Sequence, residues 1–67
     1  MLLQKFVFPS IECLNDALTH LKHSYPNLLI IAKPQLLQLY VESLNSITFD
    51  ARIESFMLNH GGKILND

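Results

Sequence analysis

Hydrophobic positions recur along the chain with two different periods, and these periods predict six secondary-structure elements. Residues 2–8 have high β propensity and are followed by Pro9, which predicts a first strand that ends there. Ser10 then stands where the N-cap of a helix belongs. The next apolar positions recur at helical spacing and predict a first helix that stops before Pro26. They are Ile11, Leu14, Ala17, Leu18, Leu21 and Tyr25.

A β-hairpin is predicted after the first helix. Residues 28–33 are almost entirely apolar, and the run is far too short to cross a membrane, so it predicts a buried strand. Pro34 marks the turn that follows. Residues 36–42 alternate between apolar and polar side chains with a period of two, which predicts the returning strand of the hairpin.

The last third of the sequence predicts a second helix and a short final strand. Ser46 and Thr48 are both candidates for the N-cap of this helix. Gly61 is placed to be the left-handed residue just past the helix end. Residues 63–65 are long enough for one more short strand. The apolar stripe of this helix consists of Phe49, Ile53, Phe56, Met57 and His60.

The predicted order is β-α-β-β-α-β, and it points to a ferredoxin-like sandwich of the α+β class. In that arrangement two helices lie on one face of a four-stranded antiparallel sheet with strand order 4-1-3-2. The alternative is a β-α-β-β-α unit whose tail stays outside the sheet. With 67 residues, the chain is expected to form one small domain over residues 1–67.

The sheet face that the helices leave uncovered is the informative feature of this prediction. Alternation assigns one set of strand residues to the inner face: Phe6, Phe8, Leu28, Ile30, Leu37, Leu39, Val41 and Ile64. The outer set is too apolar for open water, and strands apolar on both faces are normally covered on both. It predicts an interface made of Leu3, Val7, Leu29, Ile31, Leu36 and Tyr40, with Lys5, Lys33 and Glu42 as its polar rim.

These features predict a small non-catalytic protein-interaction or regulatory module that forms a homodimer, or a larger homo-oligomer, through its outer sheet face. Tyr40, Leu29 and Ile31 are the expected centre of the interface, because a large amphipathic aromatic residue flanked by aliphatic ones makes a typical anchor. The alternative function is a ligand-sensing regulatory domain that binds a small molecule at a dimer seam. The plainest alternative is that a small domain tolerates scattered apolar surface residues.

Composition narrows the class of protein. Hydrophobic residues make up 49% and charged residues 16% of the chain, which excludes a disordered tail. The formal charge of −1 gives no basis for binding nucleic acid. Sheets that bind RNA stack bases on aromatic side chains of their central strands, and Tyr40 would be the one outward aromatic on those strands here. The single Cys13 excludes a disulfide scaffold and favours the reducing cytoplasm. The first ten residues do not resemble a secretion signal, and no membrane association is expected.

Candidate chemistry is sparse. His20 and His23 form an H-x-x-H pair on the first helix, and Cys13 lies on nearly the same flank as His20. His23 projects ~60° further round the helix, so these three residues do not predict a metal site. His60 falls on the apolar stripe of the second helix without an evident acid, base or nucleophile partner. We therefore expect no catalytic residues, no metal and no cofactor.

Overall fold

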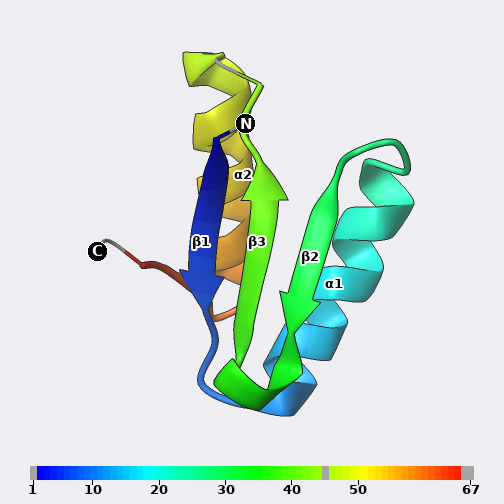
Figure 1. Ribbon diagram of the computed structural model, residues 1–67, viewed down its shortest axis with the longest axis vertical. Coiled ribbons are helices and arrows are strands. Elements are labelled where there is room, and N and C mark those ends of the chain that lie inside the picture. Colours follow the sequence, from blue (N-terminus) through cyan, green and yellow to red (C-terminus); the bar gives the residue numbers. More distant parts are fainter. Residues whose placement is uncertain (1, 45, 66–67) are drawn as a thin grey trace.

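The computed structural model describes residues 2–44 and 46–65 of the chain (Figure 1). Two of its elements are α-helices, four are strands, and one is a 3-10 turn between the second and third strands. The bounds are β1 Leu3–Val7, α1 Ile11–Ser24, β2 Ile30–Lys33, η1 Pro34–Leu36, β3 Gln38–Glu42, α2 Ile47–Asn59 and β4 Lys63–Ile64. The short fourth strand is therefore present, and residues 66 and 67 of the predicted tail lie outside the described residues.

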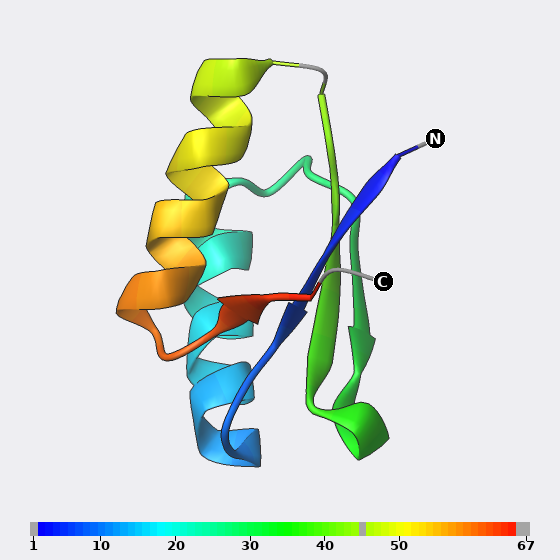
Figure 2. The ribbon, with the colours of Figure 1, turned by 90° about the vertical axis from the view of Figure 1, so that its left-hand side faces the viewer.

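The four strands form one antiparallel sheet in the order β2-β3-β1-β4. Read from the opposite edge, the same neighbours are β4-β1-β3-β2. Both helices lie on one side of this sheet, and the other side is left open (Figure 2). The prediction of an α+β fold with two helices and a four-stranded antiparallel sheet is confirmed.

Each helix begins at a serine that caps it. The Ser10 hydroxyl oxygen accepts a hydrogen bond from the backbone N–H of Cys13 at 3.2 Å. The Ser46 hydroxyl oxygen accepts one from the backbone N–H of Phe49, also at 3.2 Å. These bonds satisfy amides that have no partner within the helix. Of the two candidates for the second cap, the chain uses Ser46, and Thr48 lies inside α2.

The core fills the space between the inner sheet face and the two helices. Three of its residues lie on α1 at helical spacing, and two on α2, as the apolar stripes predict. Where α1 ends and α2 begins, the rings of Tyr25 and Phe49 meet edge to face with centroids 5.6 Å apart. The buried core consists of Phe6, Phe8, Leu14, Ala17, Leu21, Leu39, Val41, Ile53 and Met57.

The hairpin differs from the prediction at its turn. Pro34 starts a 3-10 turn, because its ring fixes φ near the helical value, so Leu36 lies in the turn rather than on the third strand. Leu37 adopts a left-handed conformation (φ 56°). Its carbonyl oxygen accepts a 2.8 Å hydrogen bond from the Phe8 amide, which joins the turn to the end of β1. The third strand consequently begins at Gln38.

Leu37 was predicted on the inner face and lies instead at the end of the turn. Leu28 precedes β2, which begins at Ile30, but its half-buried side chain packs against the core. Ile64 pairs with Phe6 and so belongs to the inner side by register, yet it is 40% exposed. Its exposure follows from its place on a two-residue strand at the edge of the sheet.

Candidate functional site

The outer face of the sheet is a grid whose rows are set by strand pairing. In an antiparallel pair, directly opposed residues point to the same face. The middle row therefore joins Ile31, Tyr40 and Lys5 across β2, β3 and β1. In a second row, Leu3 on β1 is opposite Glu42 on β3. Leu29 lies beside Glu42, because the Leu29 carbonyl oxygen accepts a 3.0 Å hydrogen bond from the Glu42 amide. Figure 1 views this face from the front.

The third row of the grid is mainly polar. Gln38 of β3 is opposite Lys33 on β2 and Val7 on β1, and Val7 is in turn opposite Lys63 on β4. The outer face thus has an apolar end and a cationic end. Lys63 was not among the predicted rim residues, since only the register of the short β4 strand shows that it belongs to this face.

Five of the six residues predicted for the interface lie on this grid or directly beside it. Leu29 and Ile31 are each 39% exposed, while Leu3, Val7 and Tyr40 are half-buried by their neighbours. The sixth, Leu36, is 56% exposed but stands in the turn after β2. It lies outside the strands, and its assignment to them was wrong.

Tyr40 lies at the centre of the face between two lysines. The ammonium nitrogens of Lys33 and Lys5 are 5.1 and 5.7 Å from the centroid of its ring, within the range of cation–π attraction. Its hydroxyl group donates a 3.0 Å hydrogen bond to Gln38 Oε1. These contacts hold the ring in place on the sheet and surround an aromatic side chain with charged ones.

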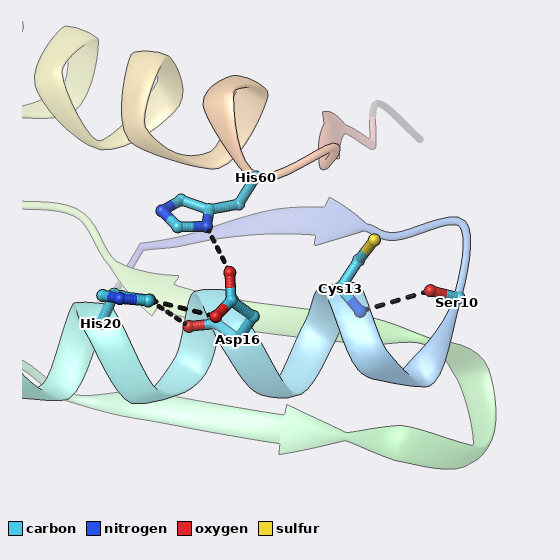
Figure 3. Close-up of polar contacts among 5 residues, drawn as sticks. All are labelled: Ser10, Cys13, Asp16, His20 and His60. Atoms are coloured by element: carbon cyan, nitrogen blue, oxygen red, sulfur yellow. Dashed lines mark hydrogen bonds and ion pairs between the residues drawn. The ribbon is translucent and has the colours of Figure 1, made fainter.

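A second cluster lies on the helix side of the molecule, where α1 passes the end of α2 (Figure 3). His60 Nδ1 is 3.0 Å from Asp16 Oδ2, and His20 Nδ1 is 3.4 Å from Asp16 Oδ1. His20 Nδ1 is also 2.9 Å from the backbone oxygen of Asp16. The two imidazole rings face each other with centroids 5.1 Å apart. Asp16 therefore sits between two histidines that are 40 residues apart in the sequence.

The end of α2 holds His60 in this position. The Gly61 amide donates to the Leu58 carbonyl at 3.1 Å, and the Gly62 amide donates to the Met57 carbonyl at 2.8 Å. This pair of bonds is a Schellman motif, with Gly61 at φ +83° as predicted. His60 is the C-cap residue of the helix, and its ring stacks on Phe56 at 4.6 Å. Its side chain is consequently only 21% exposed.

The structure groups the candidate ligands differently from the sequence. His20 meets Asp16 and His60, and neither Cys13 nor His23 belongs to that group. Cys13 is half-buried against the core near Gly61, and its thiol is free. The spacing of Asp16 and His20 by one helical turn was readable in the sequence. The contribution of His60 depends on how two distant helices pack, for which the sequence carries no local signal.

Comparison of the chain with protein families, curated proteins and solved structures gives no match. Across residues 2–44 and 46–65, neither helix combines the length and the apolar character that a membrane crossing needs.

Proposed function

We propose that this chain is a small non-catalytic interaction module that associates with a second copy of itself through the outer face of its sheet. The observation that carries the proposal is the group of apolar side chains toward one end of that face, where Ile31 and the ring of Tyr40 are neighbours and Leu3 and Leu29 flank Glu42 on the uncovered side. Contiguous apolar surface is costly to leave in water, and two such sheets can pack face to face at ~10 Å.

Tyr40 supports the proposal as the anchor of the interface. Tyrosine is enriched among residues that dominate binding energy, particularly where it is central and surrounded by contacts that exclude water. Here it lies in the middle row and is already held by Gln38, Lys5 and Lys33, so little side-chain freedom remains to be lost on association.

We further propose the ferredoxin-like sandwich as the architecture of the module. The β-α-β-β-α-β order, the antiparallel neighbours β4-β1-β3-β2 and the single helical layer support this assignment. The free thiol of Cys13 supports a reducing compartment such as the cytoplasm as its location.

The charge on the outer face favours a second candidate partner, an acidic segment of a different protein. Lys33 and Lys63 lie in one row at one end of the described part of this face, and the Glu42 carboxylate lies at the other end. Two copies of a cationic face repel each other, so added salt should strengthen self-association by screening. Salt should weaken binding of an acidic segment, since it screens an attraction. The salt dependence therefore separates the two candidates.

Sedimentation equilibrium over a wide range of protein concentration tests the proposal. We expect a reversible monomer–dimer equilibrium that shifts to monomer in Tyr40→Glu and Ile31→Asp, while the circular dichroism spectrum remains that of the folded chain. Leu58→Glu is the matched control, because Leu58 is 55% exposed on α2, away from the sheet face.

Three results would count against self-association through this face. A purely monomeric chain at high concentration would exclude the second copy as the partner. A dimer that dissociates in Leu58→Glu but not in Tyr40→Glu would place the interface on the helices. Loss of the folded spectrum in both sheet variants would mean that the face assignment is wrong. A reproducible thermal shift with an amino acid or nucleotide would instead favour the ligand-sensing alternative.

A further inference from the structure

We infer that Asp16, His20 and His60 form a binding site for a divalent transition-metal ion of the zinc class. The three side chains are the set of described residues whose potential ligand atoms all lie within 4.8 Å of one another. Two come from the middle of α1 and one from the end of α2, so a bound ion would connect the two helices (Figure 3).

The donor set suits zinc. Imidazole nitrogen and carboxylate oxygen are both common zinc ligands, whereas calcium and magnesium prefer oxygen ligands alone. Zinc–nitrogen and zinc–oxygen bonds of about 2.0–2.1 Å in a tetrahedral arrangement place neighbouring ligand atoms roughly 3.3 Å apart. The two nitrogen–oxygen separations around the Asp16 carboxylate are 3.0 and 3.4 Å. The two nitrogens contact different oxygens of this carboxylate, and the ligand atoms lie within 4.8 Å of one another, so side-chain rotation must bring one oxygen and both nitrogens together around the ion.

Of the three candidate ligands, His60 is held in place, whereas Asp16 and His20 are exposed. His60 is held by the stack on Phe56 and by the glycine turn that follows it, which fixes one ligand in advance. The side chains of Asp16 and His20 are 59% and 57% exposed, so their present polar contacts, including that of His20 Nδ1 with the Asp16 backbone oxygen, can be exchanged for bonds to an ion. Their exposure also leaves the remaining coordination position open to water. Three protein ligands with one open position is a recognised zinc arrangement.

A bound ion would act as a clamp between α1 and α2. Because the unfolded chain does not hold these three residues together, binding to the folded state raises its stability. With free zinc at about a hundredfold excess over its Kd, the melting temperature should rise by roughly 10–20 °C. This effect arises on the helix side, so it is independent of the association proposed for the sheet face.

Isothermal titration of the untagged chain with zinc chloride tests the inference directly. We expect saturable binding of one ion per chain. His60→Ala, His20→Ala and Asp16→Asn should each weaken binding by more than about tenfold, since each removes one of three ligands. His23→Ala is the matched control: it removes an exposed histidine from the same helix, outside the group, and should leave the affinity unchanged. The zinc-dependent rise in melting temperature should follow the same order.

Cobalt(II) provides a spectroscopic test of the ligand set. We expect visible bands of a tetrahedral or five-coordinate ion without a thiolate-to-metal charge-transfer band, because Cys13 is not a ligand. Absence of saturable zinc binding would overturn the inference, as would equal losses in His23→Ala and His60→Ala. A thiolate band would overturn the assigned ligands. If His60→Ala fails to fold, the variants of exposed Asp16 and His20 decide the question on a folded chain.

Discussion

Substituting Gly62 with alanine should destabilise the fold by steric conflict with the core. A Cβ atom at this position would lie 2.7 and 2.8 Å from two carbons of the Phe8 ring and 3.1 Å from the Met57 carbonyl oxygen. Real Cβ atoms do not approach others so closely, so one of the groups must move. Phe8 is 3% exposed within the core, and the Met57 carbonyl already accepts a hydrogen bond from the Gly62 amide. Neither can shift without disturbing its own packing.

The expected loss is about 2 kcal/mol, in the range typical of overpacked cores. A chain of this size has a total stability of roughly 3–10 kcal/mol, so the loss is a substantial part of it. The melting temperature should fall by about 8–16 °C, and urea denaturation followed by circular dichroism would give the free energy directly.

Gly61→Ala is the matched control because it tests a different cause at the adjacent position. The atoms nearest to a Cβ there would belong to Pro9 and Cys13, at 3.7–3.8 Å, which is ordinary contact. Its cost comes instead from the positive φ, about 1–2 kcal/mol for a residue with a side chain. Gly61→Asn should recover part of this loss, since asparagine enters the left-handed region more readily. Gly62→Asn should show no such recovery.

A double-mutant cycle with Phe8→Leu gives the decisive result. Leucine removes the ring atoms that the new methyl group would strike, so Gly62→Ala should cost at least about 1 kcal/mol less in that background. An unchanged cost in the Phe8→Leu chain, or a neutral Gly62→Ala in the parent chain, would refute the steric explanation.

Two further predictions concern the helices. Ser46→Ala removes the hydroxyl oxygen that accepts a hydrogen bond from the Phe49 amide, and it should lower the stability of the fold by about 1 kcal/mol. Thr48→Ala lies beyond the cap and should lower the stability far less. Equal losses of stability in the two variants would argue against the cap. Ile53→Ala opens a cavity at a fully buried position and should cost about 2–5 kcal/mol, while Ile47→Ala on the same helix, at a residue 90% exposed, should be near neutral. Urea denaturation measures all four variants, and a small effect at Ile53 would mean that the core is not packed as described.

The periodicity of the sequence was sufficient for the elements and for most of the core. The centre of each predicted stripe is buried, whereas Ile11 at the start of the first stripe is 39% exposed. Ser10 is the N-cap of α1 and Gly61 is the left-handed residue after α2, as predicted. The prediction was wrong mainly at the turn of the hairpin. Alternation extended the third strand back to Leu36, but Pro34 favours a helical turn, and local backbone geometry prevailed over the hydrophobic pattern.

The two candidate surfaces differ in how far the sequence could anticipate them. The outer face follows from period-two alternation, because every second strand residue must point away from the helices. Only the cross-strand register could add Lys63 to it. The histidine–aspartate cluster depends on contacts across 44 positions of the chain, between Asp16 and His60, and no periodicity encodes that distance.

The two helices contact each other through different chemical groups at the two ends of the pair. Near the start of α2, Tyr25 and Phe49 meet through their aromatic rings, and this contact is indifferent to ions in solution. Near the end of α2, the contact is the Asp16 carboxylate between the imidazoles of His20 and His60, and all three groups are able to bind a metal ion. Between these two ends, the helices share the buried core. A metal ion should therefore act on the helix pair at its His60 end and leave the contact between Tyr25 and Phe49 unchanged.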